Sequence, residues 1–145
     1  MRQFEIVSIN ISKKKGVVKT PVSNVRLIQD FGIEGDAHGE TPGKQVSLLA
    51  LEDIEYMQKK LNSIKPGDFA ENITTKGIEL YTLPVGSLLK IGEVELKITK
   101  IGKECHHGCE IKQKTGECIM PKRGIFAEVL NGGTIFTGIK GILFN

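Results

Sequence analysis

The sequence predicts a mostly β protein, either a β-barrel or a curled sheet. Three observations support this prediction. The apolar segments are short, turn-forming residues that include 17 glycines separate them, and only two segments have the apolar spacing of a helix. Short strands joined by turns produce this pattern. With so few helices to cover a flat sheet, we expect the strands to close or curl on themselves.

Length and charge narrow the class of protein. The chain has 145 residues, a size that buries roughly 70% of the unfolded surface in one core, so we expect one domain over residues 1–145. Lys and Arg number 20 and Asp and Glu 17, and the net charge of +3 indicates neither a nucleic-acid nor a membrane partner. No apolar run approaches the roughly 18 residues of a membrane span, and no signal peptide begins the chain. We therefore expect a cytoplasmic protein.

The first half of the chain contains three predicted strands. Residues 2–11 carry apolar side chains at Phe4, Ile6 and Ile9, and the alternation is interrupted at Val7. Residues 25–28 and 45–49 are short apolar runs bounded by turn residues. Three lysines at 13–15 precede a glycine, and we interpret them as an exposed hairpin tip, because no aromatic residue is present among them to stack on a base.

The most regular predicted helix covers residues 51–61. Leu51, Ile54 and Leu61 mark one apolar face, and Met57 is interpreted as core. Acidic residues at 52–53 and lysines at 59–60 fit the charge preference of the two helix ends.

The second half continues with turns and strands. A polar turn at 67–72 leads into a β-prone stretch that ends at Thr75, and residues 83–102 predict two strands around a turn at 92–93. Ile125, Phe126, Val129 and Leu130 have helical spacing, so we expect a second helix that ends at the following glycine pair. The last strands run over 134–144, with Gly138 and Gly141 as bends.

The cysteines form the most informative cluster. Cys105, Cys109 and Cys118 fall within fourteen residues, and His106 and His107 lie between the first two. An odd number of cysteines without an export signal does not predict a disulfide framework. Cationic neighbours, among them Arg123 later in the same region, would lower the pKa of the Cys105 thiol and favour the reactive thiolate. A small buried hydrophobic residue is the alternative interpretation.

Zinc is a second possible use of this cluster. Cys105, Cys109 and Cys118 with one histidine would supply four ligands. Structural zinc sites usually pair two closely spaced dyads, whereas here the third cysteine stands alone. We therefore rank zinc below a reactive or ligating thiol.

Two polar loops contain residue types that could bind a metal ion or act in catalysis. Glu34, Asp36 and His38 lie in the glycine-rich stretch 32–39, where they would suit metal binding or acid–base catalysis. The favoured alternative is a turn in which Asp36 accepts hydrogen bonds from backbone N–H groups. The same alternative applies to Glu71 and Asn72, because a polar turn after Pro-Gly needs such residues without any catalysis.

Six blocks of sequence together resemble the MOSC domain, the module named after the C-terminal part of molybdenum cofactor sulfurase. They occur in the family's order and span nearly the whole chain. They are Gly32-Ile33-Glu34-Gly35-Asp36-Ala37-His38, Gln45-Val46-Ser47-Leu48-Leu49, Gly67-Asp68-Phe69-Ala70-Glu71-Asn72-Ile73, Leu83-Pro84-Val85-Gly86 with Ile91-Gly92, Ile101-Gly102-Lys103-Glu104-Cys105, and Arg123-Gly124-Ile125-Phe126-Ala127-Glu128-Val129-Leu130 with Gly132-Gly133.

The resemblance implies a MOSC-type β-barrel of short strands with a few short helices, of the small stand-alone bacterial type. It also implies association with the molybdenum cofactor (molybdopterin) and a functional cysteine at Cys105. Cys109 is the alternative position, and both are candidate metal ligands. The motif positions that would line the cofactor pocket are Glu34, Asp36, His38, Lys44, Gln45, Glu71, Asn72 and Arg123. At Lys44 many relatives carry Arg, whose planar fork holds phosphate better than a point charge.

Three functions remain open from the sequence. The favoured one is a cofactor-binding protein that holds the molybdenum cofactor or its precursor, or carries sulfur to it, through a cysteine thiolate during cofactor maturation. The second is a molybdenum-dependent reductase of N-hydroxylated compounds, although the extra N-terminal β domain of those reductases is not found here. The third is a non-catalytic zinc-binding or docking module for a cofactor biosynthesis enzyme.

Overall fold

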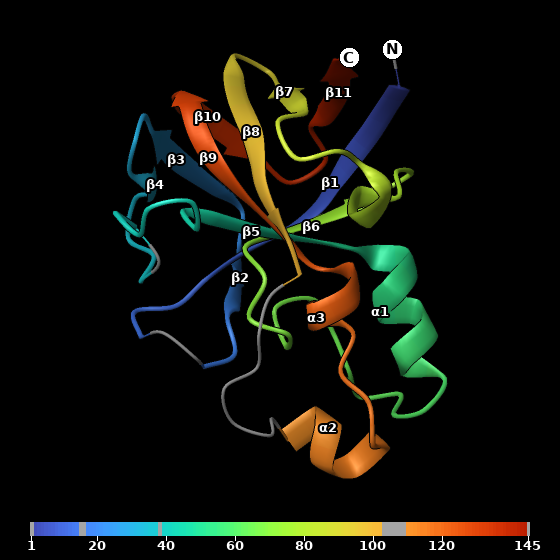
Figure 1. Ribbon diagram of the computed structural model, residues 1–145. Helices are drawn as coiled ribbons and strands as arrows, with labels where there is room; N and C mark the ends of the chain where they lie inside the picture. The colour runs from blue at the N-terminus through green and yellow to red at the C-terminus, as the bar shows by residue number, and fades with distance from the viewer. Residues whose placement is uncertain (1, 15–16, 38, 103–109, 145) are drawn as a thin grey trace.

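Seven strands close into a barrel in the computed structural model, which describes residues 2–14, 17–37, 39–102 and 110–144 (Figure 1). Around the barrel the order is β1 (Arg2–Ile11), β6 (Ile73–Lys76), β5 (Val46–Ala50), β9 (Ile125–Asn131), β8 (Val94–Ile101), β7 (Leu88–Ile91) and β11 (Lys140–Phe144). The barrel closes where β11 pairs with β1, with Arg2 opposite Leu143. The predicted mostly β-barrel fold is confirmed.

One pair of barrel strands, β5 and β6, is parallel, and the other six pairs are antiparallel. An odd number of strands cannot close into a ring with antiparallel pairs alone. A parallel pair also needs a crossover connection rather than a tight turn. Here the crossover consists of α1 (Leu51–Gln58) and the loop at residues 59–72.

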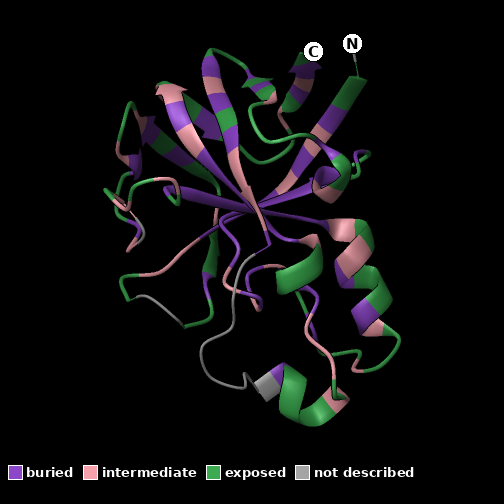
Figure 2. Ribbon diagram, viewed as in Figure 1, coloured by how far each residue is buried: buried purple, intermediate pink, exposed green. Residues whose placement is uncertain are grey.

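The barrel interior is the main hydrophobic core. Alternate residues along each strand point inward, as the pleat of a β-strand requires. Leu48, Leu96, Ile98 and Val129 are among the fully buried members of this core. Buried residues alternate with half-buried or exposed ones along β8 and β11 (Figure 2). A β-bulge in β1 between Ile6 and Ser8 preserves this arrangement. The bulge explains the broken alternation at Val7.

A second core lies outside one end of the barrel. The helices α1, α2 (Glu110–Thr115) and α3 (Met120–Arg123) gather at that end (Figure 1). Leu49, on the outer face of β5, packs there with Ile54, Met57, Ile111 and Met120. The sequence pattern does not predict α2 and α3. None of the helices in the described part of the chain is long and apolar enough to cross a membrane.

The remaining strands lie beside the barrel. β2 (Thr20–Val22) pairs with the second half of β1. β3 (Asn24–Ile28), β4 (Gly32–Ile33) and β10 (Gly133–Phe136) form a small antiparallel sheet with β3 in the middle, and η1 (Leu80–Thr82) is a single 3-10 turn. The strands predicted at 2–11, 25–28 and 45–49 are confirmed to within one residue as β1, β3 and β5.

The helix predicted from Ile125 to Leu130 is wrong, because this segment forms the barrel strand β9. Ile125, Ala127 and Val129 point into the barrel core, whereas Phe126 is buried on the outer face. Apolar residues on both faces of a covered strand imitate helical spacing.

Two smaller expectations are corrected. Helix α1 ends at Gln58 with Lys59 as its C-cap, so Lys59 and Lys60 follow the helix instead of forming its last turn. Gly141 lies within β11 instead of at a bend, and glycine is needed there because the Phe4 ring packs where a side chain would be.

Removing a buried barrel side chain should destabilise the protein far more than removing an exposed one. We expect Leu96→Ala to lower the free energy of unfolding by about 2–5 kcal/mol, because it deletes buried methyl groups and leaves a cavity. Val85→Ala, at a side chain that is 61% exposed, should change it by less than about 0.5 kcal/mol. Urea unfolding of both variants measures the difference, and similar losses would contradict the assignment of the core.

Candidate functional site

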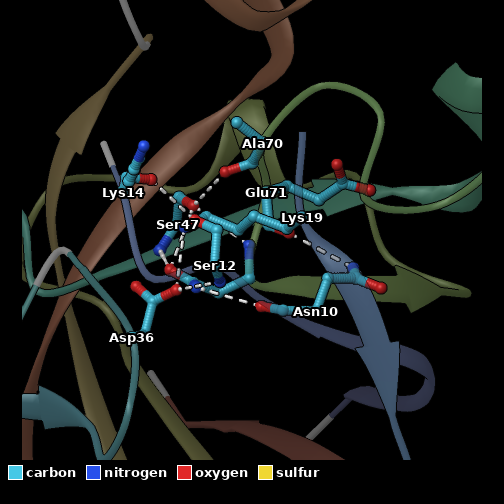
Figure 3. A network of polar contacts seen from close by, with 9 residues as sticks. Asn10, Ser12, Lys14, Lys19, Asp36, Ser47, Ala70 and Glu71 are labelled. Atoms are coloured by element: carbon cyan, nitrogen blue, oxygen red, sulfur yellow. Dashed lines mark hydrogen bonds and ion pairs between the residues drawn. The ribbon is translucent and has the colours of Figure 1, made fainter. Parts of the chain in front are cut away.

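A polar network is buried on the outer side of strands β1, β5 and β6 (Figure 3). Its members are Asn10, Ser12, Lys19, Asp36, Ser47, Ala70, Glu71, Asn72 and Thr74. The β1 bulge turns Asn10 toward it, and Ser47 faces it because its neighbours in β5 point into the barrel. The network therefore lies where the parallel strand pair meets β1.

Asn72 connects three strands within the polar network. Its Oδ1 accepts hydrogen bonds from the Ser47 N–H at 3.0 Å and the Ser47 hydroxyl at 3.2 Å, and its Nδ2 donates to the Asn10 carbonyl at 3.2 Å. It is fully buried. Asn72 therefore uses its side chain to fix the start of β6 against β5 and β1.

Glu71 holds the turn that precedes β6. Its Oε2 accepts hydrogen bonds from the Gly67 N–H at 3.0 Å and the Thr74 hydroxyl at 2.9 Å, and the residue is fully buried. Gly67 has a φ of +94°, and a Cβ atom there would collide with the Lys19 carbonyl oxygen. Glycine is therefore required where this turn packs against the start of β2.

Lys19 and Asp36 form a buried ion pair. The Lys19 Nζ lies 2.8 Å from Asp36 Oδ1 and donates to the Ser12 hydroxyl at 2.9 Å, and neither charged side chain is exposed to solvent. The Ser12 N–H also donates to Asp36 Oδ1 at 3.0 Å. The pair joins the connection between β1 and β2 to the loop after β4. The sequence alone does not identify Lys19 as a buried residue, because lysine is almost always exposed and nothing local distinguishes this one.

Four of the eight residues predicted to bind the cofactor are buried. Asp36, Glu71 and Asn72 come together in the polar network, whereas Gln45 accepts a hydrogen bond from the Val129 N–H of β9 at 3.0 Å. All four use polar atoms to hold segments of the chain together. Glu34 is exposed in the loop after β4, and His38 lies outside the described residues.

Lys44 belongs to a second group, on the outer face of β8 and β9. Its Nζ lies 5.9 Å from the centre of the Phe126 ring, and Phe126 is opposite Lys100 in the register of the two strands. Lys44 is exposed and Lys100 half-buried. We call Lys44, Phe126 and Lys100 the cationic face.

The start of the cysteine-containing segment is held beside this face. The Gly102 N–H donates to the Gly124 carbonyl at 2.6 Å. Gly102 has a φ of +90°, and a Cβ atom there would collide with the Pro121 carbonyl oxygen. Cys105 and Cys109, with His106 and His107, lie outside the described residues. After them, Ile111 of α2 packs into the helical core.

Arg123 belongs to a third group, around a pocket of ≈ 410 Å³. Its guanidinium stacks 4.0 Å from the centre of the Tyr81 ring, and its Nη1 lies 3.6 Å from Asp53 Oδ1. Burial raises the pKa of the Asp53 carboxyl, and the Arg123 charge offsets part of this effect. Thus the structure separates Arg123 from the buried carboxylates with which the sequence had grouped it.

The described residues include no group of three His, Cys, Asp or Glu side chains that could hold a metal ion. Cys118 is half-buried and packs against the helical core. A zinc site formed by the three cysteines and one histidine would require Cys105 and Cys109, which are outside the described part of the chain.

A surface ion pair fixes the chain at Glu117, between α2 and α3. The Glu117 carboxylate accepts hydrogen bonds from the Lys60 Nζ at 2.6 Å and the Tyr56 hydroxyl at 3.1 Å. The bond from Lys60 lowers the pKa of Glu117, and the same bond raises the pKa of Lys60. This contact attaches the connection between α2 and α3 to α1.

Breaking the buried ion pair should be costly. We expect Lys19→Met to lower the free energy of unfolding by about 3–5 kcal/mol, because it leaves the Asp36 carboxylate buried without its cation. The matched control is Lys65→Met, which removes an exposed lysine from its ion pair with Asp68 and should cost at most about 1 kcal/mol. Denaturant unfolding compares the two, and equal losses would show that the buried pair is unimportant.

The Glu117 contact should stabilise the protein only while the carboxylate is ionised. Because its folded-state pKa is lowered from 4.5, the contribution is complete above pH 4.5 and disappears as pH falls through the lowered value. The stability difference between wild type and Glu117→Gln should therefore shrink in acid, as measured by unfolding at neutral pH and at pH below the lowered pKa. Glu55→Gln, at an exposed residue of α1, is the control. A difference that persists in acid would refute the contact.

The fold is similar to that of several solved protein structures. The structure resembles YuaD from Bacillus subtilis with a TM-score of 0.80 and 17% identity, covering 97% of this chain and 95% of that one. It resembles YiiM from Geobacillus stearothermophilus with a TM-score of 0.74 and 23% identity, covering 98% of this chain and 75% of that one. It also resembles YiiM from Escherichia coli with a TM-score of 0.68 and 17% identity, covering 100% of this chain and 70% of that one.

No curated protein matches the sequence. The sequence does match the family model described as the MOSC domain over residues 34–140. This match runs from the loop after β4 to the start of β11. The chain therefore belongs to the MOSC domain family, which is associated with proteins of the molybdenum cofactor.

Proposed function

We propose that this chain binds the molybdenum cofactor, or carries sulfur to it, through the thiolate of Cys105. One observation carries the proposal beyond family membership. The Gly102–Gly124 hydrogen bond fixes the start of the Cys105 segment beside the cationic face, so that positive charge lies close to where the thiol segment leaves the barrel.

Among the three groups of candidate residues, the cationic face fits the anionic part of the cofactor best. On the cationic face, the Lys44 ammonium lies over the Phe126 ring, and Lys100 is opposite Phe126 in the register of β8 and β9. Two lysines on one face suit the phosphate of a pterin cofactor. The Arg123 pocket contains three carboxylates and two guanidiniums, an arrangement that opposes a phosphate dianion. We therefore assign phosphate binding to Lys44 and Lys100.

The buried candidates act by positioning in this proposal. Asp36 is fixed by Lys19 and Ser12, so the loop that carries Glu34 and leads to His38 is held against the barrel. Glu71, Asn72 and Gln45 hold the turn before β6 and the strands β5 and β9 in place. Their substitution would displace the site through the backbone, whereas substitution of Lys44 would remove a direct contact.

The thiolate has two uses that are consistent with one site. When bound, the cofactor supplies a molybdenum centre, for which a thiolate is a soft ligand. As a carrier, Cys105 Sγ would attack the outer sulfur of a donor persulfide R–S–SH. An S–S bond forms to Cys105, the bond between the two donor sulfurs breaks, and R–S⁻ leaves as a thiolate, so that no external oxidant is needed.

Metal analysis of the purified full-length chain tests this proposal. We expect stoichiometric molybdenum after incubation with released cofactor in wild type and in Cys118→Ser, and loss of molybdenum in Cys105→Ser without a change in thermal unfolding. Loss in Cys109→Ser instead would move the ligand to Cys109. Stoichiometric zinc without molybdenum, together with destabilisation of Cys105→Ser, would refute the proposal and favour a structural zinc or docking module.

A further inference from the structure

The Arg123 pocket has the features of a separate binding site. Its volume of ≈ 410 Å³ falls in the range of about 300–1,000 Å³ that is typical of small-molecule pockets. Segments far apart in the sequence form it, namely the start of β1, the start of α1, the end of β6, η1 and α3. Its lining residues are Arg2, Ala50, Glu52, Asp53, Gly77, Ile78, Glu79, Tyr81 and Arg123.

Several charged groups in this pocket make no hydrogen bond to the fold, although Arg123 and Asp53 form an ion pair with each other. Within the described part of the chain, the guanidiniums of Arg2 and Arg123 and the carboxyl of Asp53 make no hydrogen bond, since the Arg123–Asp53 contact of 3.6 Å is too long for one. The stacking of Arg123 on Tyr81 fixes the plane of its guanidinium while leaving its N–H groups available. The other two acids are engaged, because Glu52 accepts the Gly77 N–H and Glu79 accepts the Tyr81 hydroxyl.

The charges in the pocket select a ligand of mixed charge. Two guanidiniums favour a carboxylate, which they can bind through paired N–H groups. Asp53 with its acidic neighbours favours a cation, and the three carboxylates together disfavour a phosphate or a dicarboxylate. A ligand with one carboxylate and one ammonium satisfies both sets.

We propose that this pocket binds an α-amino acid, with the carboxylate at the guanidiniums of Arg2 and Arg123 and the ammonium at Asp53. Tyr81 and Ile78 would contact the side chain of the ligand. The half-buried state of Asp53 is consistent with this role, because burial raises the pKa of its carboxyl and a bound ammonium would favour the ionised form. The proposal does not depend on molybdenum or on Cys105.

Binding of three matched probes to the full-length protein tests the charge requirement. The probes are L-alanine, propionate, which lacks the ammonium, and ethylamine, which lacks the carboxylate. In nuclear magnetic resonance titrations L-alanine should shift the amide signals of the pocket residues and bind about tenfold or more tightly than either analogue, since each analogue loses one charge-assisted contact. Equal binding of propionate, or no binding of L-alanine, would overturn the proposal.

Variants locate the site. Arg123→Gln and Asp53→Asn should each weaken L-alanine binding by about tenfold or more, whereas Arg26→Gln on β3 and Glu55→Gln on α1, both at exposed residues, should bind as wild type does. Arg123→Lys keeps the positive charge but loses the planar guanidinium group. It replaces Arg123→Gln in this test if Arg123→Gln fails to fold. Cys105→Ser should bind L-alanine normally, which separates this proposal from the cofactor proposal. Unchanged binding in Arg123→Lys and Asp53→Asn would show that the two residues only connect α3 to α1.

Discussion

The parallel pairing of β5 and β6 is the constraint on which the rest of the structure depends. A ring of seven strands needs one parallel pair, and that pair needs a crossover outside the barrel. In this protein the crossover supplies α1, with Asp53 in its first turn, and the turn that ends in Glu71 and Asn72. Because Asn72 bonds to both Ser47 and Asn10, the same turn fixes the join between the parallel strands and β1. All three groups of candidate residues are arranged around this crossover and the neighbouring strand β9.

Charges buried on the outer side of the barrel have a different role from the apolar residues inside it. Removing two charges such as those of Lys19 and Asp36 from water carries a desolvation cost that can exceed the gain from their attraction. What the pair supplies is specificity, since an ammonium held by Asp36 and Ser12 fixes the relative position of two loops. The apolar core could not do this, because hydrophobic contacts are not directional. The cationic face and the Arg123 pocket are more exposed, and their charges remain available to ligands.

Some elements of this fold can be predicted from the sequence and others cannot. Strands with one inward and one outward face, such as β8, were predicted because alternation of apolar residues is a local property. The strand β9 was mistaken for a helix because both its faces are covered, with Val129 in the barrel and Phe126 beneath other parts of the chain. The short helices α2 and α3 were missed because a second core, rather than local periodicity, stabilises them. Motif positions identified the family, yet they did not separate residues that position the backbone from residues that present free charges.

The sequence by itself determined the β-rich class, most of the strands and the family, since these depend on local alternation, turn chemistry and short motifs. Only the tertiary structure decided what each candidate residue does. Asp36 is paired with Lys19, seventeen positions away, and Arg123 lies against Asp53 and Tyr81, which belong to other elements. Barrel closure brings these partners together from separate parts of the chain. The environment of a charge, and therefore its role, is a property of that packing and cannot be derived from its neighbours in sequence.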